Sequence, residues 1–113
     1  MKFFVKIFLI IFLIVTSCSK DASVFVPECI QSKLVDFTSN SACSQNATLK
    51  EYTFLNKTVF VFDPGNCGAD LTSEVIDENC NNMGFLGGIS GNDSISGKSF
   101  SKNAVLIRLI WKN

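Results

Sequence analysis

The chain has 113 residues, 47% of them hydrophobic, and its ten basic side chains balance ten acidic ones at neutral pH. It contains no histidine, which excludes the commonest general base, the commonest metal ligand and every nucleophile pair that depends on histidine. Its basic residues form no cluster of the kind that attracts nucleic acid, so we expect no nucleic-acid partner. The length suits one small domain.

The start of the chain has the layout of an export signal. Lys2 and Lys6 precede an unbroken apolar run at Ile7–Val15, and small residues lead from that run to Cys18. The run has about half of the roughly 20 residues that a membrane-spanning helix needs. This order of basic, apolar and small residues predicts a signal peptide that is removed, and not a membrane span.

The four residues Val15-Thr16-Ser17-Cys18 resemble the signal at which bacterial lipoproteins are cut and acylated. The resemblance implies removal of residues 1–17, acylation of Cys18 and stable anchoring by more than one acyl chain. The residue after Cys18 is serine, not the aspartate that retains some lipoproteins in the inner membrane. We therefore expect an outer-membrane location, facing the cell surface, and the alternative is an ordinary signal peptide with Cys18 as a structural thiol.

Removal of the signal leaves Cys18–Asn113, which is 96 residues with eight basic and ten acidic side chains. Residues 18–26 are expected to form the lipid tether and residues 27–113 a single domain. A domain of this size has modest stability without covalent support. The chain has four cysteines beyond Cys18, an even number in an exported protein, which predicts two disulfides.

These four cysteines are Cys29, Cys43, Cys67 and Cys80. Four cysteines allow three pairings, and we expect Cys29–Cys43 with Cys67–Cys80 because these pairs close two short loops of similar length. A zinc site is the alternative for the four thiols. It is disfavoured because such sites use close pairs of cysteines, which this chain lacks.

The first regular element is expected to be a helix from Pro27 to Thr38. Proline is well placed in the first turn of a helix, and Glu28 complements the positive end of the helix dipole. The apolar residues of this segment are expected to form one stripe that packs on the core. They are Ile30, Leu34, Val35 and Phe37.

A β-hairpin is expected next, after a polar loop at Ser39–Leu49. Its strands are Glu51–Phe54 and Thr58–Asp63, which are rich in β-branched and aromatic residues and turn near Asn56-Lys57. The aromatic residues alternate with other residues in each strand, so one aromatic face is expected to lie against the helix. They are Tyr52, Phe54, Phe60 and Phe62.

The second half of the chain predicts further short strands. A turn-forming cluster at Asp63–Asp70 ends the hairpin, and strands are expected at Ser73–Asp77 and Gly84–Ile89, followed by a loop at Ser90–Lys98. The dense apolar segment Ala104–Trp111 is expected to be a central or well-covered strand. The predicted fold is α+β, with one N-terminal helix on a four- or five-stranded antiparallel sheet stapled by disulfides.

A combination of motifs runs through the predicted domain. It includes the aromatic hairpin that ends in Phe62-Asp63-Pro64, the turn Cys67-Gly68-Ala69-Asp70, and Cys80 followed by Gly87-Gly88-Ile89. Together these motifs resemble a family of small Bacteroidota lipoproteins that is classed only as a domain of unknown function. The resemblance implies an exported lipoprotein of this architecture, and it implies no activity because the family has none assigned.

Carboxylates in the turns are the residues best suited to chemistry. Asp63, Asp70 and Asp77, with Glu78, are weak candidates for a calcium site because calcium binds six to eight oxygens. A carboxylate-based hydrolase is another alternative, in which Asp63 and Asp77 face each other across the sheet. We favour neither alternative, and expect no catalytic residue and no cofactor.

The favoured function is a non-enzymatic binding module of the cell envelope, with a protein or glycan as ligand. The presenting loops are expected at Cys67–Asp70 and Gly87–Ser96, and Phe85 is the aromatic residue suited to anchor a partner. A structural envelope protein is the alternative. Asp93-Ser94-Ile95 also fits a short bacterial O-glycosylation pattern, which makes Ser94 a weak candidate for modification.

Overall fold

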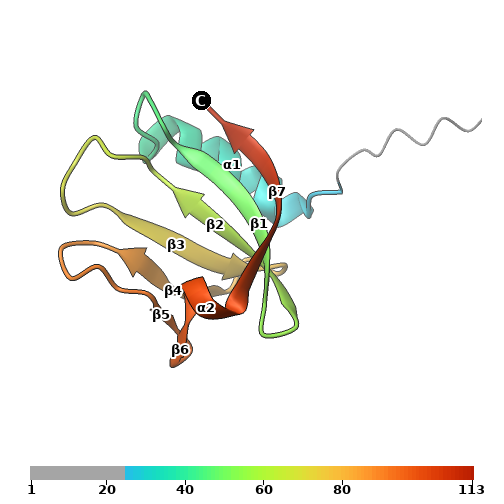
Figure 1. The fold of residues 1–113 in the computed structure, drawn as a ribbon. Coiled ribbons are helices and arrows are strands. Elements are labelled where there is room, and N and C mark those ends of the chain that lie inside the picture. Colours follow the sequence, from blue (N-terminus) through green and yellow to red (C-terminus); the bar gives the residue numbers. More distant parts are fainter. Residues whose placement is uncertain (1–24) are drawn as a thin grey trace, which may run out of the picture.

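A computed structural model describes residues 25–113, and the predicted signal, Cys18 and most of the tether lie outside the described residues. The described chain has one long helix packed on a five-stranded antiparallel sheet, as expected, and a small two-stranded sheet beside it (Figure 1). Within residues 25–113, no helix has the length and apolar character needed to cross a membrane.

The elements follow one another along the chain with short connections. They are α1 (Glu28–Asn40), β1 (Thr48–Phe54), β2 (Lys57–Asp63), β3 (Thr72–Asp77), β4 (Asn82–Gly87), β5 (Ser94–Ile95), β6 (Lys98–Ser99), α2 (Phe100–Asn103) and β7 (Ala104–Lys112). The large sheet has the order β4-β3-β2-β1-β7, and β5 pairs only with β6. Strands β1 to β4 therefore form a meander, and the C-terminal strand returns to pair with β1.

The turn of the first hairpin contains only Leu55 and Asn56, because Lys57 already pairs with Phe54. Both turn residues have positive φ, 49° and 62°. Two-residue turns of this kind match the right-handed twist of the strands that they join. The hairpin forms as predicted, and its turn comes one residue earlier than the sequence indicated.

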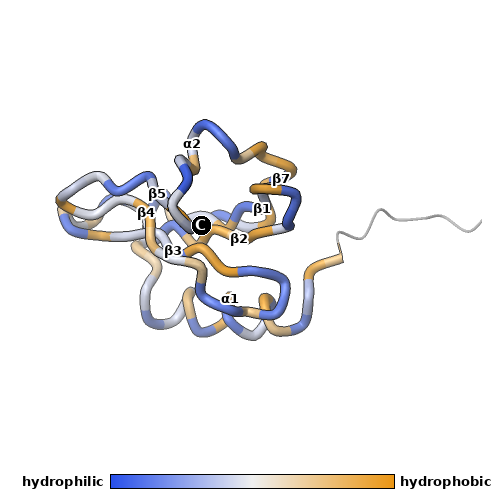
Figure 2. The backbone as a smooth tube through the Cα atoms, turned by 90° about the horizontal axis from the view of Figure 1, so that it is seen from below, coloured by the Kyte–Doolittle hydropathy of each residue, from blue (hydrophilic) through white to orange (hydrophobic). Residues whose placement is uncertain are grey.

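The core has two layers because both faces of the sheet are covered. On one face, Ile30 and Phe37 of α1 pack in a cluster with Phe60 and other residues of the sheet. On the other face, Phe100 of α2 and Ile95 of β5 complete a second cluster. Figure 2 shows the sheet between α1 and α2. Strand β2 contributes to both layers, and its residues Val59–Phe62 are all buried.

The predicted single aromatic face is wrong. Phe37 of α1 meets Phe62 edge to face, with ring centroids 5.2 Å apart. Tyr52 and Phe54, however, lie on the opposite side of the sheet, where each ring centroid is 5.1 Å from that of Phe100. The strand register explains this division, because it places Tyr52 opposite Val59 and not opposite Phe60.

One member of the predicted helical stripe is also misplaced. Ile30 and Phe37 are buried, and Leu34 packs against them. Val35 is 68% exposed, because residue 35 lies about 140° around a helix from residue 30 at the usual pitch. The helix itself forms as expected and continues two residues past Thr38.

The C-terminal strand forms where it was predicted, but its predicted central position is wrong. β7 lies at an edge of the sheet, with β1 as its only neighbour in the sheet. Four of its apolar side chains are about half exposed or more: Val105 (62%), Leu106 (53%), Ile107 (52%) and Leu109 (48%). A continuous apolar run usually belongs to a strand that is covered on both faces. The run does not determine where that strand lies in the order of the sheet.

The segment predicted as a loop at Ser90–Lys98 contains part of a small, well-built unit. Ile95 of β5 is 1% exposed and belongs to the second core cluster. The Asp93 carboxylate accepts hydrogen bonds from the Ser99 hydroxyl at 2.6 Å and from the Ser101 backbone N–H at 3.0 Å. These contacts hold β5, β6 and α2 together although each has four residues or fewer.

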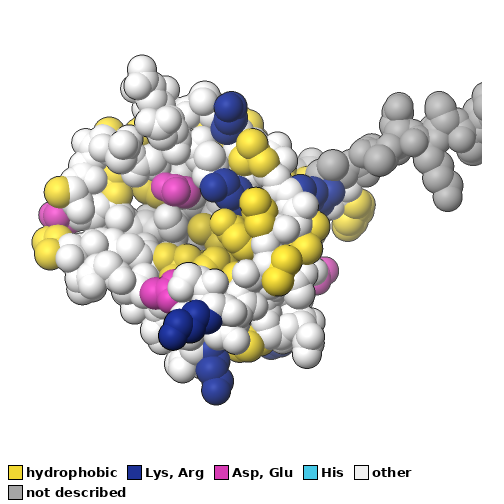
Figure 3. Space-filling model, in the orientation of Figure 1, with side chains coloured by type: hydrophobic (Ala, Val, Ile, Leu, Met, Phe, Trp, Pro, Cys, Tyr) yellow, Lys and Arg dark blue, Asp and Glu magenta, His cyan; other side chains and the backbone are white. Residues whose placement is uncertain are grey.

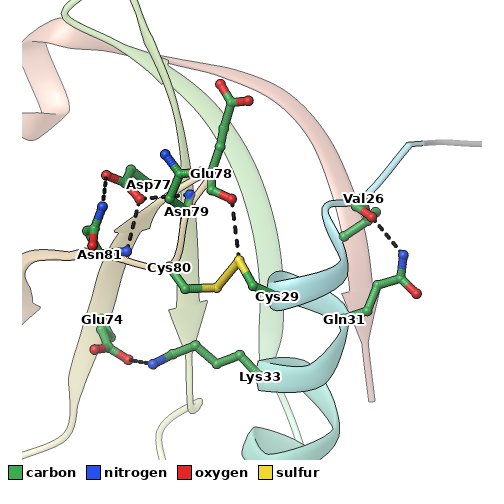
Figure 4. Close-up of a disulfide and its surroundings, with 10 residues drawn as sticks. All are labelled: Val26, Cys29, Gln31, Lys33, Glu74, Asp77, Glu78, Asn79, Cys80 and Asn81. Atoms are coloured by element: carbon green, nitrogen blue, oxygen red, sulfur yellow. Dashed lines mark hydrogen bonds and ion pairs between the residues drawn. A yellow bond between two sulfur atoms is a disulfide. The ribbon is translucent and has the colours of Figure 1, made fainter.

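Both disulfides form, but the expected pairing is wrong. Cys29 in the first turn of α1 pairs with Cys80 in the β3–β4 turn (Figure 4), and Cys43 pairs with Cys67. The Cα atoms of the pairs lie 6.1 and 5.8 Å apart. A Cys29–Cys43 bond would have to span the length of α1, roughly 20 Å at 1.5 Å per residue, and a disulfide joins Cα atoms less than about 7 Å apart.

Candidate functional site

A cleft of about 500 Å³ opens between α1 and the side of the sheet formed by β3 and β4. Its volume lies within the range of about 300–1,000 Å³ that is usual for ligand sites. We call it the α1–β3 cleft. Its lining includes charged and large apolar side chains: Lys33, Asp36, Phe37, Phe62, Asp70, Leu71, Glu74 and Phe85.

The helix presents three of these residues because positions 33, 36 and 37 lie on one face of α1. The Lys33 ammonium lies 2.6 Å from a Glu74 carboxylate oxygen and 6.0 Å from the centre of the Phe62 ring. Glu74 also accepts a hydrogen bond of 2.6 Å from the side-chain amide of Asn82. Figure 4 shows Lys33 extending from α1 to Glu74 on β3. One wall of the cleft is therefore held in place by an ion pair between the helix and the sheet.

The base of the cleft is aromatic. Phe37 and Phe62, which pack edge to face, belong both to the core and to the lining of the cleft. Two more apolar side chains are only partly covered, Phe85 at 50% exposed and Leu71 at 38%. A partner that covers these half-exposed apolar side chains would bind more tightly, because apolar surface is then removed from water.

The charges around the cleft are mainly negative. Asp36, Asp70 and Glu74 contribute three carboxylates, and Lys33 contributes one ammonium group. Lys33 is paired with Glu74, and the other ion pair among residues 25–113 lies elsewhere. Asp36 accepts a hydrogen bond of 2.7 Å from Asn40 one turn later in α1. Asp36 and Asp70 thus give the cleft an excess of negative charge over an aromatic base.

Comparison with known proteins assigns the family. The family model described as a domain of unknown function, DUF6970, matches residues 31–113. The chain belongs to the DUF6970 family. No curated protein and no solved structure gives a significant match. The matched segment includes every strand of the fold and all but the first turn of α1.

The DUF6970 domain brings together two of the residues that the sequence had singled out. Asp70, from the predicted presenting loop at Cys67–Asp70, and Phe85, the predicted aromatic anchor, both line the α1–β3 cleft. The loop is held beside α1 by the Cys43–Cys67 disulfide. The second predicted loop, Gly87–Ser96, does not contribute to this cleft, although its Ile89 is 85% exposed.

The other carboxylates of the DUF6970 domain lie apart from the cleft. Asp63 ends β2 and accepts a hydrogen bond of 2.9 Å from the Gly65 backbone N–H. Asp77 ends β3, and hydrogen bonds from the backbone and side chain of Asn81 hold its pKa below the usual range. Within residues 25–113, no three or more acidic or cysteine side chains are grouped in a way that could hold a metal ion.

The predicted approach of Asp63 and Asp77 across the sheet is wrong. Strands β2 and β3 are antiparallel, and Asp77 pairs with Val59 at the start of β2. Asp63 lies four residues further along β2, which is about 13 Å at the usual rise of a strand. The two carboxylates therefore lie at opposite ends of the strand pair, and the paired-carboxylate arrangement that a hydrolase uses does not form here.

Ser94 lies on β5 with its side chain exposed. Its neighbour Asp93 is engaged by Ser99 and Ser101, whose hydroxyl groups lower the pKa of Asp93. Its other neighbour, Ile95, is buried in the second core cluster. The Ser94 side chain is therefore accessible between an engaged Asp93 and a buried Ile95, and its modification remains a prediction.

Sequence reasoning missed three residues of the cleft, Lys33, Asp36 and Glu74. Lys33 and Asp36 lie on the polar part of α1, where charged residues are the usual solvent-facing side of an amphipathic helix. Glu74 lies in a short strand whose pairing partners were not predicted. A helical projection of α1 could have placed Lys33 and Asp36 beside Phe37, but no local signal connects them to Glu74 and Asp70.

Proposed function

We propose that this DUF6970 protein is a non-enzymatic binding protein, anchored by lipid at Cys18 in the outer membrane, that recognises a basic segment of a protein partner in the α1–β3 cleft. The observation that carries the proposal is the position of two carboxylates, Asp36 and Asp70, in a cleft that also contains the half-exposed aromatic ring of Phe85. Aromatic faces attract cations. Carboxylates form charge-assisted hydrogen bonds with lysine and arginine.

The chemistry of the cleft favours a basic side chain that is followed by an apolar one. The ammonium or guanidinium group would lie between Asp36 and Asp70, and the apolar neighbour would cover Phe85 and Leu71 at the rim. Arginine fits especially well because its planar group stacks on aromatic rings and binds carboxylates through two parallel hydrogen bonds. A neutral glycan would donate hydroxyl hydrogen bonds to Asp36 and Asp70 but would leave their negative charge unbalanced, which makes a basic peptide the better match.

The lipid anchor is supported by the sequence. The apolar run Ile7–Val15 and the residues up to Cys18 resemble a lipoprotein signal, and the motifs of the domain resemble a family of Bacteroidota lipoproteins. The absence of aspartate after Cys18 supports the outer membrane as the site of anchoring. A surface-facing domain on such an anchor would be placed where it can meet an extracellular partner.

Replacing Cys18 with alanine is expected to abolish lipid attachment, because the thiol is the group that is acylated. In cells, the wild-type protein should incorporate labelled palmitate and fractionate with the outer membrane, whereas Cys18→Ala should do neither. Glu78→Gln is a suitable control, since Glu78 is exposed and its replacement leaves Cys18 and both disulfides intact. A Cys18→Ala protein that still takes up palmitate and remains in the outer membrane would contradict the anchor.

Neutralising the cleft is expected to weaken the binding of basic peptides. The double variant Asp36→Asn, Asp70→Asn should bind short arginine-containing peptides with at least tenfold lower affinity than wild type, a loss of about 1.4 kcal/mol. Isothermal titration calorimetry measures this directly, with glutamine in place of arginine as the control peptide. Phe85→Ala should also weaken binding, because it removes the half-exposed aromatic ring at the rim of the cleft.

Glu78→Gln is the matched control variant, because Glu78 is an exposed carboxylate outside the cleft. It should bind arginine peptides as wild type does. Because Glu78→Gln removes one negative charge and the cleft variant removes two, a loss in Glu78→Gln of about half that in the cleft variant would show attraction by net charge alone. If no arginine or lysine peptide binds, the recognition proposal fails, and a structural envelope role becomes the better account of the fold.

A further inference from the structure

An exposed apolar surface of the described chain lies along β7. Four neighbouring residues of that strand and one residue before α1 form it, and we call this surface the β7 patch: Val105, Leu106, Ile107, Leu109 and Phe25. Phe25 is 83% exposed. Figure 3 shows hydrophobic side chains gathered on the side of the molecule from which the grey N-terminal segment departs. Neighbouring exposed apolar side chains on a protein often mark a surface that something else covers.

The N-terminal end of the domain is fastened directly to β7. The Arg108 guanidinium donates a hydrogen bond of 2.7 Å to the backbone carbonyl of Phe25. The same group pairs with Glu51 of β1 at 3.0 Å, so Arg108 is held in place by the sheet. The chain that leads back to Cys18 therefore leaves the domain at the β7 patch, and not from the far edge of the sheet.

The distance from that point to the lipid is short. Seven residue steps separate Phe25 from Cys18, and seven steps of fully extended chain reach at most about 25 Å. An acylated Cys18 would thus keep the β7 side of the domain near the membrane surface. The proximity to a bilayer and the exposed apolar side chains are two independent features of the same side of the molecule.

A partner strand is a poorer match for this surface than a bilayer. The pairing of β7 with β1 is interrupted twice, at Ile107 and at Ile110, where β7 has one extra residue relative to its neighbour. Such bulges twist an edge strand and break the row of hydrogen-bonding groups that an added strand would need. β7 also contains Arg108 and Lys112 but no acidic residue, so nothing on the strand opposes contact with anionic headgroups.

We propose that the β7 patch lies in the interfacial layer of the membrane that holds the Cys18 lipid and acts as a second, non-covalent anchor that orients the domain. The proposal rests on the proposed lipid anchor.

The orientation of the domain also determines where the α1–β3 cleft lies. Strand β3 is three strands away from β7 in the sheet, about 14 Å at the usual strand spacing. The α1–β3 cleft would then face away from the membrane and remain open to a partner.

The test uses tryptophan as a probe of membrane contact in the chain Cys18–Asn113. Residues 25–113 contain both disulfides and both core clusters, so this form retains the whole folded domain. The Cys18 thiol is coupled to a maleimide lipid in vesicles of phosphatidylethanolamine and phosphatidylglycerol. This coupling places a lipid at residue 18 whether or not cells acylate Cys18. Two variants, both with Trp111→Phe, carry the probe at Ile107→Trp in the β7 patch or at Ile89→Trp.

The two probe positions are both exposed, at 52% and 85%, but Ile89 lies beyond β4 at the other edge of the sheet. With lipids brominated near the headgroup end of the acyl chain, fluorescence at position 107 should be quenched at least twice as strongly as at position 89. Its emission should also shift to the blue on tethering. Cooperative urea unfolding of both variants verifies that each is folded.

Each other outcome opposes the proposal. Equal quenching at the two positions would show that the domain has no preferred orientation. Stronger quenching at position 89 would place the opposite edge on the membrane. A dimer in sedimentation experiments that Ile107→Asp dissociates would assign the β7 patch to a second copy. Failure of palmitate labelling in cells would overturn the natural anchor separately, because the vesicle experiment does not depend on it.

Discussion

Replacing Cys29 and Cys80 together with alanine is expected to lower the free energy of unfolding by about 4 kcal/mol. The bond joins residues 51 positions apart, so its loss restores much conformational freedom to the unfolded chain. The Cys43–Cys67 bond spans 24 positions, and its removal should cost about 3.5 kcal/mol in the same entropic model. For a domain of this size either loss is a large part of the total stability.

Urea unfolding of the two double-alanine variants, beside the wild-type domain, measures both values. Peptide mapping of the unreduced protein provides the control, since it identifies the pairs directly. A peptide that joins Cys29 to Cys43 would contradict the observed pairing. A larger loss for the Cys43–Cys67 variant would show that the two bonds do not act mainly through the unfolded chain.

The second large effect is expected at Phe60 in the centre of the sheet. Its ring is 1% exposed, and it lies in the cluster that joins α1 to the sheet. Phe60→Ala should lower the free energy of unfolding by about 3–5 kcal/mol, because it leaves a cavity between two layers that cannot close fully.

Phe85→Ala is the matched control, since it removes the same side chain from a half-exposed position. Its cost should be below about 1 kcal/mol. Urea denaturation compares the two variants at constant temperature. Equal losses would mean that the packing of α1 on Phe60 contributes little. A stable Phe85→Ala protein is also what makes this variant informative in the peptide-binding experiment.

The positions of most strands in the sequence were predictable, because strands are marked by β-branched and aromatic residues between turn-forming segments. The alternation of aromatic residues and the turn expected near Asn56-Lys57 were sufficient to predict the β1–β2 hairpin, whose turn lies at Leu55-Asn56. Strand order was not predictable, because a continuous apolar run has the same appearance in β2 and in β7. Of these two strands, only β2 has a neighbouring strand on each side and a layer on each face. The apolar run of β2 is therefore buried, whereas β7 at the edge of the sheet is partly exposed.

The same distinction applies to the candidate site. Asp70 was selected as a weak candidate for calcium binding in a predicted presenting loop, and Phe85 as an aromatic anchor for a partner; both line the α1–β3 cleft. Lys33, Asp36 and Glu74 could not be assigned to it from local patterns. Their proximity depends on the way α1 crosses β3, and that crossing results from the burial of Ile30 and Phe37 in the sheet.

The sequence by itself determined the α+β class, the helix, the hairpin and the presence of two disulfides, because periodicity, turn residues and an even cysteine count are local properties. Only the tertiary structure decided which cysteines pair, which strand lies at the edge and which charged residues share a cleft. These properties join segments that are far apart in the chain, such as Cys29 with Cys80. They follow from the packing of two layers against one sheet, and that packing buries apolar residues from segments that are far apart in the chain.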